Sequence, residues 1–196
     1  MIIVKDRSAA NHWAVVHTSC TITGTTTIVD PEYKMLRLDS TDAEYDYQNL
    51  VVSPGQSSTT FTLGNQVNVN GLNNTYIAYC FHSVDGYQKL GSYTGNGTTG
   101  QTINVGFTPR FVMIKAYTNS SAYTSWGMFD NQRLASSTDV NALWANQSAA
   151  EGYRGNGTST DTYLELEFIT NTGFRLTDAS DELNDPNNDY IYLAIA

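Results

Sequence analysis

An acidic segment near the end of the sequence holds the residues best suited to bind a cation. Its carboxylates belong to Asp178, Asp181, Glu182 and Asp185, and several Asn residues lie among them. Oxygen-rich side chains on a loop are what Ca²⁺ prefers, but the spacing does not match an EF-hand. The segment 65–73, its counterpart in the first half of the chain, contains no carboxylate. We therefore favour a solvated polar loop and keep calcium as the only candidate cofactor.

His12, His17 and Cys20 lie close in sequence and suggest a nucleophile with a base. Their spacing matches no Cys–His site, and no third group is evident that would orient the base. The three histidines of the chain also lack a metal-binding spacing such as His-x-x-x-His. We expect these residues to be structural, with Cys20 and Cys80 as separate thiols.

Two carboxylate pairs have the spacing that places both side chains on the same side of a strand. They are Asp42 with Glu44 and Glu165 with Glu167. Glycoside hydrolysis needs two carboxyl groups that face one cleft. Glu165 and Glu167, however, alternate with leucines, which is typical of a strand with one solvent-facing side. We therefore expect no catalytic residues and no enzymatic activity.

Aromatic side chains offer a different chemistry, because sugar rings stack on Trp and Tyr faces while amides and carboxylates bind their hydroxyls. Four aromatic residues fall in or beside polar, loop-like stretches: Trp144, Tyr117, Tyr123 and Tyr153. They are the candidate glycan-binding residues. The alternative for Trp144 is a strand position that corresponds to the neighbourhood of Leu36. Trp13 and Trp126 occupy matching places in the two halves, and we expect both in the core.

The composition restricts the partners. The chain of 196 residues has a formal net charge of −9, and its ten Lys and Arg residues are scattered singly. Binding to phosphate backbones or anionic lipid needs clustered basic residues, so we expect no nucleic-acid partner. No run of about 18 apolar residues is present, so we expect no membrane insertion either. Only 15% of residues are charged, while Gly, Tyr, Thr, Ser and Asn are frequent, which favours strands and turns over helices.

Short strand patterns and an internal repeat predict the architecture. Residues 60–63 and 163–168 alternate between apolar and polar side chains, and residues 75–81 have the pattern of a mainly buried strand. Five blocks recur in the same order in the two halves: 2–5, 13–17, 42–44, 61–63 and 73–77 match 112–115, 126–130, 149–151, 174–176 and 187–191. We predict an all-β chain of two tandem β-sandwich units, residues 1–85 and 86–196.

The second unit is the fuller copy. It opens with strand patterns at 87–93 and 101–105, and a Gly-Phe-Thr-Pro-Arg turn at 106–110 follows them. None of these segments has a counterpart before Ile2, so the first unit lacks its opening strands and one sheet edge is left without a partner. We expect either a longer chain upstream of Met1, which we favour, or strands donated by a neighbouring subunit through β-augmentation.

Six blocks together resemble an uncharacterised repeat domain of bacteriophage virion proteins, with relatives in marine and cyanobacterial phages. They are Tyr93–Gly97, Gly106–Pro109, Val112–Lys115, Trp126–Asp130, Gly173–Leu176 and Tyr190–Ala194. The resemblance covers nearly the whole second unit and residues 1 to about 81 of the first. It implies a lectin-like jelly roll of the concanavalin type in tail-fibre-like structural proteins, with no assigned catalytic residues.

The repeat, the resemblance and the incomplete catalytic sets lead to a functional expectation. We expect a non-enzymatic virion structural protein on the particle surface, as a fibre, an appendage or a capsid-decoration component. Its partners would be other virion subunits, in a homo-oligomer. The alternative is a carbohydrate-binding adhesion module that recognises host surface glycans. An envelope-degrading enzyme is a third and weaker hypothesis.

Overall fold

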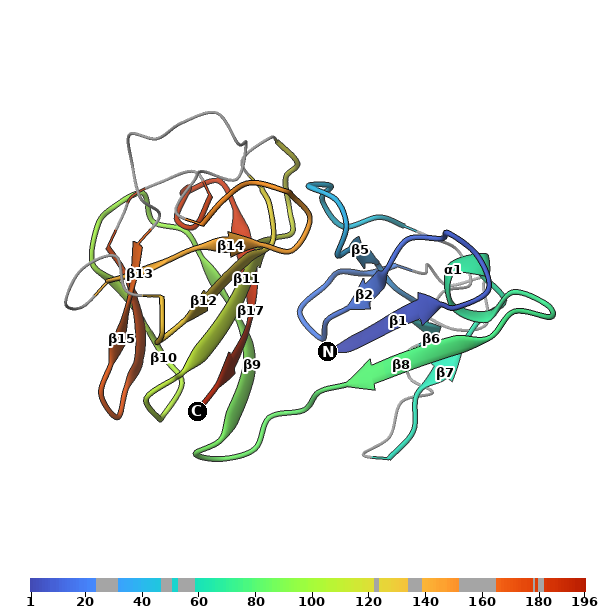
Figure 1. Cartoon of the computed structure of the whole chain (residues 1–196), viewed down its shortest axis with the longest axis horizontal. Helices are drawn as coiled ribbons and strands as arrows, with labels where there is room; N and C mark the ends of the chain where they lie inside the picture. The colour runs from blue at the N-terminus through green and yellow to red at the C-terminus, as the bar shows by residue number, and fades with distance from the viewer. Residues whose placement is uncertain are drawn as a thin grey trace.

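The protein is all-β, as the sequence predicts. The computed structural model describes residues 1–23, 32–46, 51–52, 59–121, 124–133, 139–151, 165–177, 179 and 182–196. Within these residues the strands β1 to β17 form four antiparallel sheets, and the single helical turn is α1 (Val67–Asn70) (Figure 1). Antiparallel sheets with one or both faces covered are the basis of β-sandwiches.

The first half of the chain contributes two sheets, each named here after one of its strands. The β1 sheet has the order β5-β2-β1-β8, and the β4 sheet has the order β3-β4-β6-β7. Their strands are β1 (Ile2–Asp6), β2 (Ala14–Val16), β3 (Ile22–Thr23), β4 (Glu32–Tyr33), β5 (Leu36–Arg37), β6 (Val51–Val52), β7 (Thr62–Leu63) and β8 (Tyr76–Cys80).

The second half contributes the other two sheets. The β11 sheet has the order β14-β12-β11-β17-β9, and the β15 sheet has the order β10-β16-β15-β13. Their strands are β9 (Gln88–Thr94), β10 (Gln101–Asn104), β11 (Phe111–Ala116), β12 (Gly127–Asp130), β13 (Asp139–Asn141), β14 (Leu143–Trp144), β15 (Glu165–Ile169), β16 (Gly173–Leu176) and β17 (Asp189–Ile195).

Three apolar clusters separate the four sheets. Side chains of a strand alternate between its two faces, and in β11 Val112 and Ile114 enter the cluster shared with the β15 sheet, whereas Met113 enters the cluster shared with the β1 sheet. In β1, Ile3 faces that same central cluster, and Val4 faces the cluster shared with the β4 sheet. The sheets are therefore layered in the order β15, β11, β1 and β4, with the β11 sheet covered on both faces (Figure 1).

Polar contacts cross the central cluster as well. The indole Nε1 of Trp126, a residue only 1% exposed, donates a hydrogen bond of 2.8 Å to the Arg37 carbonyl in the first half. Lys115 is fully buried, and its Nζ donates to the carbonyls of Ala116 at 2.7 Å and Thr41 at 3.3 Å. Burial lowers the pKa of Lys115 to about 7, although the charge of Asp42 opposes the shift. The two halves are thus joined by directed bonds in addition to apolar packing.

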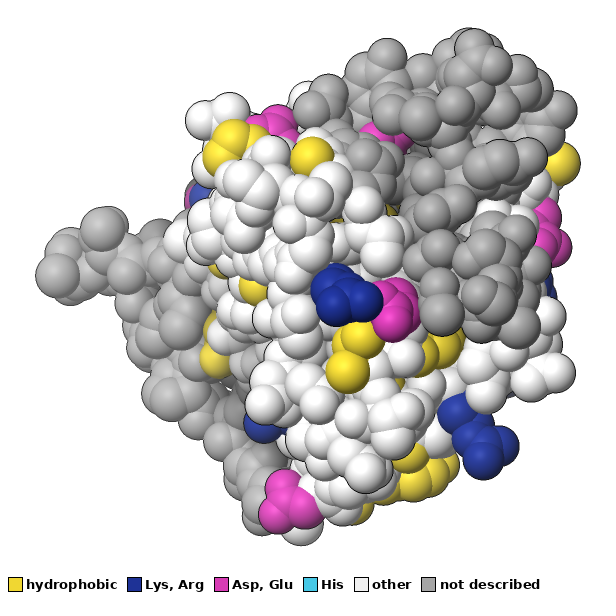
Figure 2. All heavy atoms as spheres, turned by 90° about the vertical axis from the view of Figure 1, so that its left-hand side faces the viewer, with side chains coloured by type: hydrophobic (Ala, Val, Ile, Leu, Met, Phe, Trp, Pro, Cys, Tyr) yellow, Lys and Arg dark blue, Asp and Glu magenta, His cyan; other side chains and the backbone are white. Residues whose placement is uncertain are grey.

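Among the described residues, the outer surface of the molecule on the side of the β15 sheet carries only scattered basic side chains. On the face shown in Figure 2, the described Lys and Arg side chains lie apart from one another and do not gather into a patch. Scattered basic residues do not create the potential that attracts a polyanion.

Trp126 and Trp13 provide a matched test of the central cluster, because each lies one residue before the corresponding strand, β12 or β2. Trp126→Ala should lower the free energy of unfolding by about 3 to 5 kcal/mol, since a large buried ring and its hydrogen bond are lost. Trp13→Ala, at a partly exposed residue, should cost less than about half as much. Urea denaturation followed by circular dichroism measures both. Equal losses would mean that the central cluster does not hold the halves together.

Candidate functional site

The β11 sheet does not cover one end of the β1 sheet. The side chains on this end of its central face are Lys5, Trp13, Ile77 and Tyr79, which we call the Trp13 surface. Ile77 is 40% and Tyr79 is 44% exposed, and Trp13 is partly buried. Exposed apolar side chains that lie together on a strand face often mark an interaction site.

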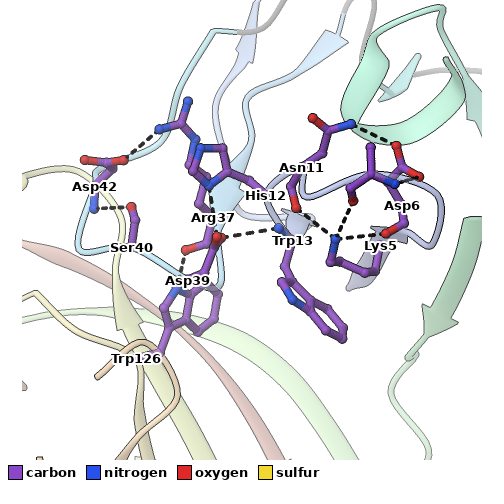
Figure 3. A network of polar contacts seen from close by, with 11 residues as sticks. Lys5, Asp6, Asn11, His12, Trp13, Arg37, Asp39, Ser40, Asp42 and Trp126 are labelled. Atoms are coloured by element: carbon purple, nitrogen blue, oxygen red, sulfur yellow. Dashed lines mark hydrogen bonds and ion pairs between the residues drawn. The ribbon is translucent and has the colours of Figure 1, made fainter. Parts of the chain in front are cut away.

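The aromatic rings of the Trp13 surface lie nearly parallel. The ring centroids of Trp13 and Tyr79 are 6.5 Å apart with an interplanar angle of 22°, and Lys5 Nζ lies 6.0 Å from the Trp13 ring centroid. Lys5 Nζ also donates to the backbone carbonyls of Asp6, Ala9 and Asn11 at 2.8, 3.3 and 2.9 Å (Figure 3). The ammonium group therefore fixes the loop after β1 and lies close to the indole, a favourable cation–π arrangement.

Asp6 holds the same loop from its other side. Its carboxylate accepts hydrogen bonds from the backbone N–H groups of Ser8 and Ala9 and from the amides of Asn11 and Asn74, at 2.7 to 3.2 Å. Burial opposes ionisation of Asp6, but these hydrogen bonds outweigh it and lower the pKa of the carboxyl below its usual value. Because Asn74 precedes β8, Asp6 also connects the loop to the strand that carries Tyr79.

Asp39 anchors the backbone of Trp13. Its Oδ1 accepts from the Trp13 N–H at 3.3 Å, and its Oδ2 lies 2.9 Å from Nδ1 of His12 (Figure 3). Nearby, Arg37 pairs with Asp42 at 3.1 Å. The Trp13 surface thus combines a fixed aromatic platform with exposed imidazole and carboxylate groups. Such an arrangement can stack on a flat apolar face and hydrogen-bond to its edges, but it pairs no nucleophile with a base.

The four aromatic residues expected to bind a glycan are not brought together. Trp144 is 4% exposed and lies in the cluster between the β11 and β15 sheets, so its indole is a core side chain. Trp144 is therefore not a glycan-binding candidate. It lies in strand β14, which agrees with the alternative of a strand position. Tyr117 is partly buried against the central cluster. Tyr123 and Tyr153 lie outside the described residues.

The candidate calcium ligands are likewise not assembled in the described part of the chain. Asp178 and Asp181 lie outside it, and Glu182 is 1% exposed. Asp185 Oδ1 accepts from the backbone N–H and the side-chain amide of Asn187 at 2.8 and 3.0 Å, which is a turn-capping role. Among the described residues, no group of three or more His, Cys, Asp or Glu side chains is placed to bind a metal.

His17 and Cys20 lie inside the fold, apart from the exposed His12. His17 Nδ1 accepts from the Ser19 N–H at 3.0 Å, and Nε2 makes no hydrogen bond within the described residues, although the Tyr192 backbone lies near. Burial raises the pKa of Cys20 to about 12, so its thiol stays neutral. Neither residue has the properties of a nucleophile or its base.

The carboxylate pairs have structural partners. Glu44 accepts from the Thr21 N–H at 2.8 Å and lies 3.6 Å from Lys34, while Asp42 pairs with Arg37. Glu167 forms an ion pair with Arg175 across β15 and β16. The side chain of Glu165 lies outside the described residues.

The sequence pattern of the strand at 75–81 is misleading. It predicts a mainly buried strand, but the residues Ile77 to Cys80 of β8 are exposed. The physical reason is that β8 is the last strand of its sheet, and no strand covers its far side within the described residues.

A cleft lies near Ala196, the residue that follows β17. It is an open cleft of about 580 Å³, and its lining includes Phe107, Thr108, Arg110, Asn131 and Phe168. The residues that line it include two phenylalanines and one arginine, but none with a carboxylate side chain.

Comparison with known proteins assigns the chain to a family. The model of a domain of unknown function, DUF7483, matches residues 1–196. The chain belongs to this family. No curated protein and no solved structure matches it. One DUF7483 match thus spans all four sheets. Within the described residues of this family member, no helix has the length and apolar character needed to cross a membrane.

The burial of His17 predicts a pH dependence of stability. Burial, together with the nearby Met1 amino group, lowers the pKa of His17 to about 4. The unfolded chain therefore binds a proton that the folded chain does not, between pH 6.5 and about 4, and stability falls as pH falls through this window, by up to about 3 kcal/mol. Urea denaturation across this range should show a smaller fall in His17→Gln. The control, His12→Gln, should behave like the wild type, and identical pH profiles for all three would contradict the assignment.

Proposed function

We propose that the chain is a non-enzymatic structural component of a bacteriophage virion, built from two copies of one jelly-roll-like β-sandwich unit and acting at the particle surface through contacts with other subunits. The sequence resemblance to phage virion repeat domains supports the virion assignment. The architecture supports the two copies, and the exposed side of β8 supports the subunit contacts. Fibre, appendage and capsid decoration are all compatible with this role.

Strand order is the first support for two copies. The order β5-β2-β1-β8 corresponds strand for strand to β14-β12-β11-β17, and β4-β6-β7 corresponds to β13-β15-β16. The strands β9 and β10 have no counterpart in the described part of the first half. Each of them forms the edge of its sheet, β9 beside β17 and β10 beside β16.

Hydrogen bonds around the two tryptophans repeat as well. The Trp13 N–H donates to Asp39 Oδ1 at 3.3 Å, and the Trp126 N–H donates to Asn146 Oδ1 at 2.9 Å. The residue before each acceptor donates its N–H back to the carbonyl of the same tryptophan, at 3.0 and 3.1 Å. Similar local bonds at matching positions are expected if both halves descend from one unit.

Tyr76, the first residue of β8, and Tyr190, the second residue of β17, show a third correspondence. The Tyr76 hydroxyl accepts from the Gly71 N–H at 2.7 Å, and the Tyr190 hydroxyl accepts from the Asp185 N–H at 2.9 Å. In both cases the donor lies five residues before the tyrosine. The turn before the strand is thus closed by the same bond in both halves.

One difference between the halves carries the proposal of subunit contacts. Ile191 and Leu193 of β17 are 1% and 3% exposed, whereas Ile77 and Tyr79 at the matching positions of β8 are 40% and 44% exposed. Proteins generally protect apolar sheet edges, because unpaired N–H and C=O groups there recruit other strands. A partner subunit that covers β8 would remove this exposure.

The virion assignment can be tested on particles. In phage particles purified from a lysate in which this chain is expressed, mass spectrometry should recover it in several copies per particle. Antibodies against the chain should label intact particles, because we place it at the surface. Recovery only in the particle-free fraction would contradict the proposal.

The Trp13 surface favours a second candidate function, the binding of host glycans. The stacked rings of Trp13 and Tyr79 resemble the platforms on which sugar rings bind, and the exposed groups of His12 and Asp39 border them. A glycan array identifies a ligand under this hypothesis. Trp13→Ala should reduce the affinity by about tenfold or more, while Tyr87→Ala, at a tyrosine that is 57% exposed elsewhere, should not change it. An array without any hit would remove this candidate.

A further inference from the structure

We infer that the outer edge of β8 binds an extended strand donated by a neighbouring polypeptide, and that the side-chain pattern of this strand follows that of β9. The inference rests on the two-copy architecture proposed above, and it specifies the chemistry of the partner.

The backbone of β8 presents a free row of hydrogen-bonding groups. Phe81 N donates to Met1 O and Arg7 N donates to Thr75 O, both at 2.8 Å, so the odd-numbered residues of this region bond to β1. In an antiparallel ladder the alternate residues point their N–H and C=O groups the other way. Tyr76, Ala78 and Cys80 therefore direct theirs to the outer edge, where no strand pairs with them among the described residues.

The second half shows how such an edge is filled. β9 pairs antiparallel with β17, and the register places Tyr93 opposite Tyr190 and Gly91 opposite Tyr192. The rings of Tyr93 and Tyr190 stack at 4.9 Å with an interplanar angle of 7°. At position 91 a Cβ atom would lie 2.4 Å from the Tyr192 hydroxyl, so a larger residue there would require the Tyr192 ring to move. β9 thus completes the ladder and covers the aromatic face of β17.

Superposing this register on β8 defines the donated strand. Tyr76 takes the place of Tyr190, so the donor needs an aromatic side chain where β9 has Tyr93. Ala78 takes the place of Tyr192, and the space that its small side chain leaves admits an apolar residue where β9 has Gly91. Leu90 of β9 faces Leu193, and Tyr79 stands there in β8, so a large apolar donor residue would cover the exposed ring.

A second copy of this chain, paired through β8 itself, is the main competitor. Antiparallel pairing about Ala78 would place Cys80 beside Tyr76 and leave the Tyr76 ring without an aromatic partner. The strand β9 of a second copy is already engaged with β17. A separate polypeptide with a β9-like strand fits the edge better than either arrangement.

A cysteine peptide tests both the binding and its register. The probe is the segment 87–97 as a synthetic peptide with Lys89→Cys, because residue 89 faces Ala194 in β17 and would face Cys80 in β8. Paired residues of an antiparallel ladder have Cα atoms about 5.5 Å apart, which permits a disulfide. Under mild oxidation the peptide should cross-link to Cys80, which is exposed, and not to Cys20, which is buried. The control peptide with Gly91→Cys should cross-link at least about tenfold less, because its thiol would face Ala78.

Affinity measurements on the unmodified segment 87–97 complete the test. Tyr93→Ala should weaken its binding to the full chain by about tenfold or more, and Gly91→Val should strengthen it. Absence of saturable binding, or equal cross-linking by both cysteine peptides, would overturn the inference. A dimer of the chain that excludes the peptide would overturn it too, in favour of a second copy. These outcomes are independent of whether the chain is found in particles, so failure of the virion proposal is separately detectable.

Discussion

The structure depends on the packing of the β11 sheet against the β1 sheet. A sheet that is covered on both faces needs strands that are apolar throughout, because no side of the strand meets water. β11 and β17 meet this requirement, since nearly all of their residues are buried. Lys115 is the exception, and the carbonyls of Ala116 and Thr41 accept its hydrogen bonds. Burying an amine is costly unless it is paired in this way, so Lys115 also restricts how the two halves can sit against each other.

The same packing explains why the two halves differ at the surface. On the central face of the β11 sheet, Met113, Ile191 and Leu193 are buried, whereas the β1 sheet leaves Lys5, Trp13, Ile77 and Tyr79 uncovered at one end. β9 completes the β11 sheet, but no described strand completes the β1 sheet beside β8. The second half of the chain is therefore closed at this edge, whereas the first half has an open edge within the described residues and an aromatic surface. Both features lie on the same sheet, next to each other.

Sequence patterns predicted the all-β fold, because short apolar runs and frequent turn residues depend on local chemistry alone. They also predicted the strands around 87–93 and 101–105, which are β9 and β10. Exposure was harder to predict, because it depends on which sheets meet. Trp144 was a candidate for either a glycan surface or a strand position, and it lies in the core. The segment 75–81 was expected to be mainly buried but is exposed at Ile77–Cys80. Trp13 and Tyr79 come together only through cross-strand neighbours, which no local pattern encodes.

The central claim is that β8 is an open sheet edge, whereas β9 pairs with the outer side of β17. Hydrogen–deuterium exchange of individual amides tests this claim most directly. In a dilute solution of the isolated chain, the amides of Tyr76, Ala78 and Cys80 should exchange rapidly. The amides of Tyr190, Tyr192 and Ala194, which pair with β9, should be strongly protected. Equal protection of the two sets would show that the outer edge of β8 is already paired and would contradict this account.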